Sequence, residues 1–291
     1  MSAALLFRDA LSERGSTRVR EAASLVLLSV KRQEPLSVRQ LLLPLLTQAI
    51  YSQCLTAHAI GSWQVNGTRH WLPRFHFQRT RVRKPRIKVG IFAGIHGDEP
   101  AGILGLMDFI RELDEDPELG RAFELFIYPM CNPTGYLAGT RESAAGKDLN
   151  REFWRDSKEP EVRAIEKEIR EQKFDGIIAL HSDDTSPGFY GYARGAMLAN
   201  HLLVPALVAA EKAQPRDWRH FIDGFRAVNG IIHDAYDGIL SAPPEQHPQP
   251  FEIILESPAR TPLSEQRHAF TLALRAILSE YRNLITFGGD L

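Results

Sequence analysis

Three short polar clusters each follow a run of apolar residues with the length of a buried strand. They are centred on His96 and Glu99, on His181, and on Glu256. His96 and Glu99 are three residues apart across Gly97, so a tight turn there can direct an imidazole nitrogen and a carboxylate oxygen at one point. Two histidines and one carboxylate leave a fourth zinc position open for water and lower the pKa of that water to about 7. Glu256 would then accept the water's proton as a general base.

A fourth cluster contains Arg141 and the run Asp148-Leu149-Asn150-Arg151 in an expected loop. Two arginines and an asparagine offer a bidentate grip on a substrate carboxylate and a charged partner for an oxyanion. For this loop taken alone, the alternative is a surface ion pair between Asp148 and Arg151. Both interpretations stay open at this point.

Two acidic residues, Asp183 and Asp184, come directly after the His181 cluster. They could hydrogen-bond to His181 and orient it, as carboxylates commonly do beside metal-ligating histidines. They could instead recognise a cationic amine of the substrate. The sequence does not favour either role.

Alternating strands and helices must position these clusters. Apolar runs typical of strands occur at residues 87–92, 125–130, 176–180 and 251–255, and helical spacing of apolar residues occurs at 39–51, 100–113, 159–172, 197–212 and 264–282. A further helical fragment lies at 4–11, an exposed strand or hairpin is expected within 63–86, and 214–250 is expected to be a long loop. The alternation predicts an α/β fold, a three-layer α/β/α sandwich with a mostly parallel, mixed central sheet. In such folds ligands collect at the carboxyl ends of the strands, which is where the clusters lie.

Length and composition are those of a globular enzyme domain. The chain has 291 residues, of which 44% are hydrophobic and 24% charged, and its formal charge is -1. Residues 1–88 are basic, with fifteen Lys or Arg and four acidic residues. A basic strand near Trp63 and Trp71 could bind nucleic acid, but without a companion motif a solvated sheet edge is the better interpretation. We expect an N-terminal extension of unknown role at residues 1–60, a catalytic domain at 61–291, and no nucleic-acid partner.

Cysteine usage and hydropathy bear on the compartment. Cys54 and Cys131 cannot build a disulfide framework, which favours a reducing compartment, and we therefore expect a cytoplasmic location. The N-terminal region lacks the arrangement of a secretory signal, and no run approaches the roughly 18 apolar residues of a membrane helix. No membrane association is expected.

The order of these motifs resembles that of the carboxypeptidase A-like zinc metallopeptidases, together with the succinylglutamate desuccinylases and aspartoacylases. The shared motifs are His-x-x-Glu at 96–99, Asn-Pro-x-Gly at 132–135, Arg141, Asp-Leu-Asn-Arg at 148–151, His181 after a strand, and the late Glu256. The resemblance covers roughly residues 88–281. The compact core and the run Asp-Leu-Asn-Arg-Glu-Phe are more similar to the desuccinylase and bacterial peptide-amidase branches than to the digestive carboxypeptidases.

The resemblance implies a role for each matching residue. His96, Glu99 and His181 would hold one zinc ion, and Glu256 would activate the water. Arg141 would polarise the scissile carbonyl, while Asn150 and Arg151 would bind the substrate carboxylate. Tyr236, twenty residues before Glu256, would correspond to the mobile tyrosine of the peptidases, although Tyr190 and Tyr192 lie in another segment that could approach the site.

Three functions are compatible with these residues. The first is hydrolysis of an amide bond next to a carboxylate, in a small peptide, by a metallocarboxypeptidase mechanism. The second is deacylation of an N-acyl amino acid, as in the desuccinylases and aspartoacylases. The third, an inactive binding module, is disfavoured because all the expected ligands and the base are present.

Overall fold

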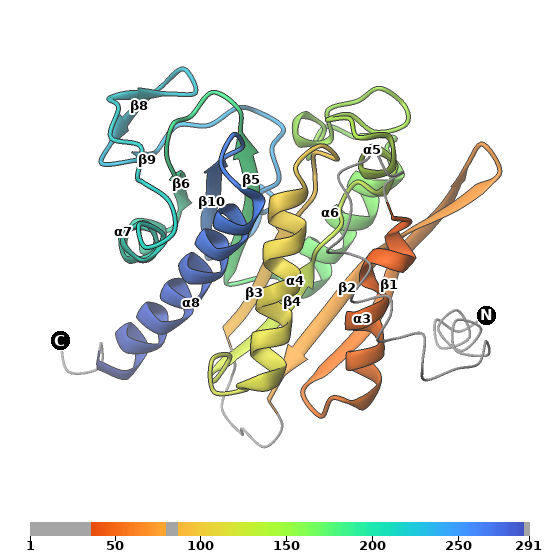
Figure 1. Cartoon of the computed structure of the whole chain (residues 1–291), viewed down its shortest axis with the longest axis horizontal. Coiled ribbons are helices and arrows are strands. Elements are labelled where there is room, and N and C mark those ends of the chain that lie inside the picture. The colour runs from red at the N-terminus through yellow and green to blue at the C-terminus, as the bar shows by residue number, and fades with distance from the viewer. Residues whose placement is uncertain (1–35, 80–86, 288–291) are drawn as a thin grey trace. The chain divides into compact units, whose positions relative to one another are not determined.

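The computed structural model describes residues 36–79 and 87–287. They form a ten-stranded sheet in the order β1-β2-β4-β3-β5-β10-β6-β9-β8-β7 (Figure 1). The strands are β1 (Leu55–Val65), β2 (Thr68–Gln78), β3 (Ile87–Ala93), β4 (Phe123–Tyr128), β5 (Gly176–Asp183), β6 (Tyr190–Gly195), β7 (Phe221–Ile222), β8 (Phe225–Val228), β9 (Ile231–Ile232) and β10 (Phe251–Pro258). The helices are α3 (Val38–Tyr51), α4 (Pro100–Glu115), α5 (Pro133–Ala138), α6 (Pro160–Gln172), α7 (Leu198–Ala210) and α8 (Leu263–Phe287). The helix expected at 4–11 lies outside the described residues.

The centre of the sheet is parallel and most of its flanking pairs are antiparallel. Strands β4, β3, β5 and β10 run parallel to one another in that order. On one side β2 and β1 continue the sheet antiparallel, and on the other side β6 pairs antiparallel with β10. The predicted mixed α/β sheet is therefore confirmed, but parallel pairing dominates only at the centre. Short turns account for the antiparallel pairs β1–β2, β7–β8 and β8–β9.

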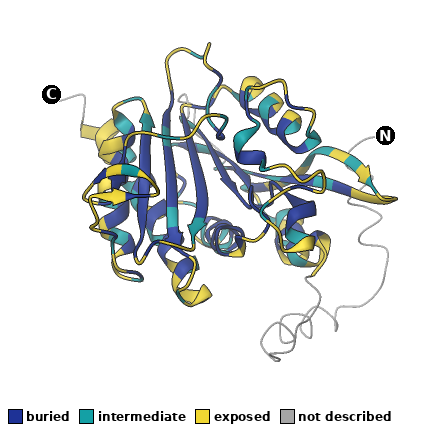
Figure 2. Cartoon of the chain, turned by 90° about the horizontal axis from the view of Figure 1, so that it is seen from above, coloured by how far each residue is buried: buried dark blue, intermediate teal, exposed yellow. Residues whose placement is uncertain are grey.

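Helices cover both faces of the sheet, as predicted for a three-layer sandwich. Figure 1 shows α3, α4 and α8 in front of the strands and α6 behind them. Helix α6 places the predicted stripe of Val162, Ile165 and Ile169 in a buried cluster with Phe92 and Phe174. Burying each such side chain contributes roughly 1.5–3 kcal/mol. In Figure 2 the strands are buried between helices whose outer faces are exposed.

Three antiparallel pairs are closed by two-residue turns that end in glycine. Asn66-Gly67 joins β1 to β2, Asp223-Gly224 joins β7 to β8, and Asn229-Gly230 joins β8 to β9. All six residues have positive φ, between 49° and 78°, as in type I′ turns, for which Asn-Gly and Asp-Gly are the preferred pairs. The interpretation of residues 214–250 as one long loop was therefore wrong, because two consecutive hairpins lie within it.

The compact unit begins at Ser37, upstream of the boundary expected at residue 60. Ser37 caps α3 in a capping box with Gln40, and strand β1 continues through residue 60, where its register with β2 shifts. Residues 37–60 thus contribute a helix and an edge strand to the same fold. Within the described residues, no helix has the length and apolar character needed to cross a bilayer.

Candidate active site

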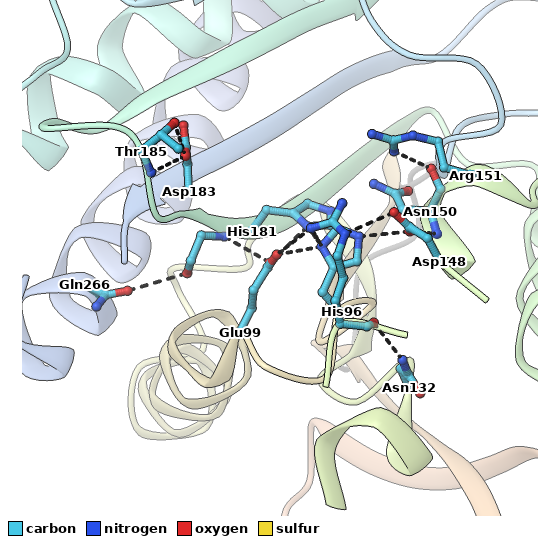
Figure 3. A network of polar contacts seen from close by, with 12 residues as sticks. His96, Glu99, Asn132, Asp148, Asn150, Arg151, His181, Asp183, Thr185 and Gln266 are labelled. Carbon is cyan, nitrogen blue, oxygen red and sulfur yellow. Dashed lines mark hydrogen bonds and ion pairs between the residues drawn. The ribbon is translucent and has the colours of Figure 1, made fainter. Parts of the chain in front are cut away.

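The sequence-predicted residues lie at the carboxyl edge of the parallel strands. His96 and Glu99 follow β3, and Glu99 is the residue immediately before α4. His181 lies near the end of β5, and Glu256 lies near the end of β10. Figure 3 shows the side chains of His96, Glu99 and His181 converging, with Asp148 on the other side of His96.

The three predicted metal ligands form one buried cluster. Nδ1 of His96 lies 2.6 Å from Oε1 of Glu99, and Nδ1 of His181 lies 3.1 Å from Oε2 of the same carboxylate. The two Nδ1 atoms are 3.2 Å apart. All three residues are at most 7% exposed, and in the described part of the chain they are the group whose geometry could hold a metal ion.

This donor set fits a divalent cation. Two imidazole nitrogens that face each other at 3.2 Å repel when both present lone pairs, and a cation between them removes the repulsion. Ligand atoms about 2.0–2.1 Å from a tetrahedral ion are about 3.3 Å from one another, close to the observed spacing. Carboxylate and imidazole ligands together suit zinc among the available divalent ions.

The pKa shifts of Glu99 and His181 suit metal binding, whereas Glu99 and Asp148 outweigh the effect of burial and raise the pKa of His96. Burial alone would raise the pKa of Glu99, but the neighbouring His181 and His96 outweigh it and lower that pKa well below its ordinary value. Burial lowers the pKa of His181. Glu99 is therefore a carboxylate and His181 neutral at pH 7, which are the states in which each binds a metal.

Close backbone contacts fix the turn that carries His96 and Glu99. A Cβ atom on Gly97 would lie 2.0 Å from the carbonyl carbon of Gly135 in α5, so only glycine fits there. The Asn132 side chain accepts a hydrogen bond from the Gly135 N–H and donates one to the Arg141 carbonyl. The Asn-Pro-x-Gly motif thus acts structurally, because it holds both the ligand turn and the Arg141 loop.

Asp148 connects the metal ligands to Arg141. Its Oδ1 atom lies 3.2 Å from Nε2 of His96, and its Oδ2 atom accepts a hydrogen bond from Nε of Arg141 at 3.0 Å. Another guanidinium nitrogen of Arg141 lies 3.2 Å from Nδ1 of His96. The alternative ion pair between Asp148 and Arg151 is absent from the ion pairs of the described residues. Asp148 instead orients His96, a contribution that the sequence analysis missed.

Glu256 projects toward the ligand cluster from the neighbouring strand. It is the register partner of His181 on β5 and of Tyr190 on β6, so the three side chains share one face of the sheet. Burial raises the pKa of Glu256 well above its ordinary value, and the charges of Glu99, Asp183 and Asp223 raise it further. A carboxylate with a raised pKa is a better proton acceptor than a solvated one.

Asn150, Arg151 and Tyr236 lie together at the rim of the site. The Asn150 side-chain oxygen accepts a hydrogen bond from the Leu240 N–H at 2.9 Å, which ties this loop to the segment after Tyr236. The Tyr236 ring lies over the Arg151 guanidinium, with 4.3 Å from Cζ to the ring centroid. The structure thus brings together these three predicted residues.

A tyrosine hydroxyl, not the ligand histidine, contacts Asp183, one of the two acidic residues that follow His181. The Tyr190 hydroxyl donates to Asp183 at 3.0 Å, and the Tyr192 hydroxyl donates to Asp223 at 2.7 Å. Neither Asp183 nor Asp223 has a Lys or Arg partner within 4.0 Å among the described residues. Asp223 was not singled out from the sequence, although the Asp-Gly pair that it begins is a turn signal.

Solved structures of known proteins share this architecture. A candidate metallopeptidase from Shewanella amazonensis SB2B superposes with a TM-score of 0.66 at 23% identity, over 82% of this chain and 90% of that one. A metallo-carboxypeptidase from Pseudomonas aeruginosa, in complex with (2-guanidinoethylmercapto)succinic acid, superposes with a TM-score of 0.61 at 18% identity, over 86% of this chain and 70% of that one. The fold is therefore that of the metallocarboxypeptidases.

Sequence comparison is more specific about the branch. Residues 85–214 match the family of the succinylglutamate desuccinylase/aspartoacylase catalytic domain, which confirms the predicted resemblance over that segment. Carboxypeptidase SOL1 from Arabidopsis thaliana is 30% identical over 141 residues, which is 43% of this chain and 28% of that protein. The chain thus matches less than a third of that relative's length. His96, Glu99, Arg141, Asn150 and His181 fall inside the family match, whereas Tyr236 and Glu256 lie beyond it.

Proposed function

We propose that this chain is a zinc-dependent hydrolase that cleaves an amide bond next to a carboxylate, by a metallocarboxypeptidase-type reaction. One observation carries the proposal. Two imidazole nitrogens and a carboxylate converge at the carboxyl edge of the sheet, and Glu256 is in register with one of these ligands, His181. Metal ligands and a separate base on adjacent strands are the parts needed to activate water.

Each residue has a distinct task in this proposal. A zinc ion held by His96, Glu99 and His181 would supply a Lewis acid and lower the pKa of water. Glu256 accepts the proton of the attacking water and later delivers it to the leaving amine. Arg141 lies beside the ligand cluster, where its positive charge stabilises the negative charge that develops on the scissile carbonyl oxygen.

The rim residues bind the carboxylate of the substrate. Arg151 presents a guanidinium that suits bidentate pairing with a carboxylate, and Asn150 supplies an amide beside it. The Pseudomonas aeruginosa protein with the same fold binds a succinic acid derivative, which supports a carboxylate ligand. The substrate would be a small peptide or an acyl amino acid with a free carboxylate.

The second candidate is an N-acyl amino acid deacylase. The family match to the desuccinylase and aspartoacylase catalytic domain favours it. Asp183 and Asp223 disfavour the binding of an anionic acyl group such as succinyl, because both carboxylates lie close enough to Glu256 to raise its pKa. An acyl group with its own carboxylate would meet these like charges near the base. We therefore place the peptidase reaction first.

Metal content and a substrate panel test the proposal. Elemental analysis of the zinc-incubated protein should find about one zinc per chain, and the loss of a ligand should remove it in His96→Ala and His181→Ala. His220→Ala, which changes an exposed histidine outside the site, should keep the metal. No bound metal in the parent protein would overturn the proposal.

The substrate panel separates the two candidate reactions. It should contain dipeptides and N-acyl dipeptides with free or amidated carboxyl ends, together with succinylglutamate and acetylaspartate. Hydrolysis restricted to free-carboxylate peptides supports the peptidase, and hydrolysis restricted to the acyl amino acids supports the deacylase. A cytoplasmic location is also part of the proposal, because Cys54 and Cys131 are both free. Fractionation of cells that produce the full chain tests it, and recovery outside the cytoplasm would contradict it.

A further inference from the structure

Asp223 occupies the first position of the two-residue turn between β7 and β8, and it connects two tyrosines. Its Oδ2 atom accepts a hydrogen bond from the Tyr192 hydroxyl at 2.7 Å. The Tyr236 hydroxyl lies 3.2 Å from Oδ1 and 3.0 Å from the backbone carbonyl of the same residue. Asp223 therefore connects strand β6 to the segment that precedes β10.

Tyr236 depends on this connection for its position. The residue lies outside any helix or strand and is 40% exposed, so a small number of contacts determines its position. Its ring is held on one side by Phe225, at 4.8 Å between centroids, and on the other by the Arg151 guanidinium at 4.3 Å. The hydroxyl is anchored by Asp223. Two of these three contacts come from the hairpin formed by β7 and β8.

The hairpin itself is well suited to hold an anchor. Asp223 and Gly224 have φ of 50° and 78°, and Phe221 and Ile222 pair with Arg226 and Phe225 across the turn. Two-residue turns of this type fix the register of their strands and thereby the direction of the side chain at the first turn position. The Asp223 carboxylate is thus presented in a defined direction.

We propose that Asp223 is a positioning residue that holds Tyr236 against Arg151 and thereby orients the guanidinium for the substrate carboxylate. The effect on the substrate acts through Tyr236 and Arg151. The proposal rests on the proposed function for the role of Arg151, whereas the anchor between Asp223 and Tyr236 stands without it. Stacking on an aromatic face restricts a guanidinium to a plane and leaves its edge free for bidentate pairing.

Two variants at residue 223 separate the side chain from the turn. Asp223→Gly removes the carboxylate but keeps the turn and the backbone carbonyl that lies 3.0 Å from the Tyr236 hydroxyl. Asp223→Asn also keeps the turn and retains one acceptor oxygen, Oδ1, while it removes the charge. Tyr236→Phe removes the hydroxyl from the other end of the anchor and leaves the hairpin unchanged. An effect of the anchor must be largest in Tyr236→Phe, which loses both contacts with residue 223, must also appear in Asp223→Gly, and must be smallest in Asp223→Asn.

The first readout is the reaction of Arg151 with phenylglyoxal, followed by peptide mapping of the zinc-incubated full chain. The ring of Tyr236 covers one face of the guanidinium, so its release should raise the rate about threefold or more in Asp223→Gly and Tyr236→Phe. Asp223→Asn should react at close to the parental rate, and Tyr236→Ala should set the upper limit. Arg163, an exposed arginine on α6, serves as the internal control in every sample.

The second readout is steady-state kinetics with the best free-carboxylate substrate of the panel. Asp223→Gly should raise KM about tenfold with kcat within about threefold of the parent, because the interaction lost is one of binding. Asp223→Asn should restore KM. The double variant Asp223→Gly/Tyr236→Phe should be no worse than Tyr236→Phe alone, because both changes remove one anchor.

The outcomes distinguish the anchor from the proposed function. If phenylglyoxal modified Arg151 at the parental rate in both Asp223→Gly and Tyr236→Phe, the anchor would be overturned, whatever the hydrolytic activity of these variants. Faster modification of Arg151 with an unchanged KM would overturn the link between the Asp223 anchor and substrate binding. A parent protein that binds no zinc and hydrolyses no member of the panel would overturn the proposed function, while the modification rates would still decide on the anchor.

Discussion

Glu256 and His181 are register partners on the adjacent parallel strands β10 and β5. Side chains at paired positions of neighbouring strands project from the same face of a sheet, so a metal ligand and the predicted base face the same space. The separation between them is fixed by the backbone hydrogen bonds of two central strands, not by a loop. Two side chains carried on paired strands are positioned more precisely than side chains carried on loops.

Glu256→Gln should abolish most turnover and leave the metal in place. Glutamine has nearly the same shape but accepts no proton at neutral pH, and general-base catalysis contributes about 10²- to 10⁴-fold. We expect kcat to fall by that factor while elemental analysis still finds zinc. Glu252→Gln, four residues earlier on the same strand, is the matched control. Turnover of Glu256→Gln at the parental rate would show that another group is the base.

Arg151→Ala should weaken binding of substrates with a free carboxylate. Loss of a charge-assisted hydrogen bond costs about 1.5–3 kcal/mol, which corresponds to a KM about 10- to 100-fold higher. The change in kcat should be small, and amidated substrates should be unaffected. Arg163→Ala removes an exposed arginine on α6 and should keep the parental KM. An unchanged KM in Arg151→Ala would mean that the carboxylate binds elsewhere.

Gly97→Ala should disrupt the ligand turn. The new Cβ would lie 2.0 Å from the carbonyl carbon of Gly135 and 2.2 Å from the Tyr136 nitrogen, and a backbone neighbour cannot rotate away. Overpacking of this kind costs about 1–3 kcal/mol, or a Tm about 5 °C lower, and it should reduce zinc retention. Gly139→Ala, at the end of α5 in open space, should lower Tm without loss of zinc. Full zinc retention in Gly97→Ala would contradict the role of this contact.

Glu161 should make stability depend on pH between about 4.5 and 7. Burial raises its pKa to about 7, since one carboxylate oxygen has only Thr134 as a side-chain donor, at 3.5 Å, and the other has no partner among the described residues. The pKa in the folded chain exceeds that in the unfolded chain, so the protonated form contributes stability below pH 4.5, and this contribution is lost as pH rises to 7.

Glu161→Gln should therefore be more stable than the parent at pH 8. The expected gain is on the order of 3 kcal/mol, since one pKa unit corresponds to about 1.4 kcal/mol. At pH 4.5 the two proteins should be similar. Thermal denaturation at both pH values measures this, with the exposed Glu171→Gln as control. An equal difference in Tm at both pH values would show that the carboxyl does not titrate as described.

The sequence was informative wherever a long element carried a strong pattern. Strands β3 and β10 were predicted to within a few residues, because they are continuous apolar runs bounded by turns. Helix α6 was predicted from the spacing of its apolar residues. The metal ligands could be found because each lies at or just after the carboxyl end of such a strand, and parallel strands gather their carboxyl ends at one edge.

The remaining features of the fold and the site depend on contacts that no local sequence pattern encodes. Strands β7, β8 and β9 have two to four residues, too few for alternation to appear, so only the Asp-Gly and Asn-Gly pairs indicated hairpins. Asp148 could be read as a partner of either arginine, and only the fold shows that it contacts His96 and Arg141. The role of Asp223 could not be predicted from its sequence neighbours, because its partners lie 13 and 31 residues away.

Strand β10 lies between β5 and β6, which are both made well before it during synthesis. An emerging chain that ends before residue 251 has all three metal ligands but neither the base nor the strand that joins its two half-sheets. The edges of β5 and β6 then present unpaired backbone groups, the kind of surface that chaperones protect. The chain therefore gains its base only when its last strand is inserted, so a nascent or truncated chain could bind a cation without acting on peptides around it.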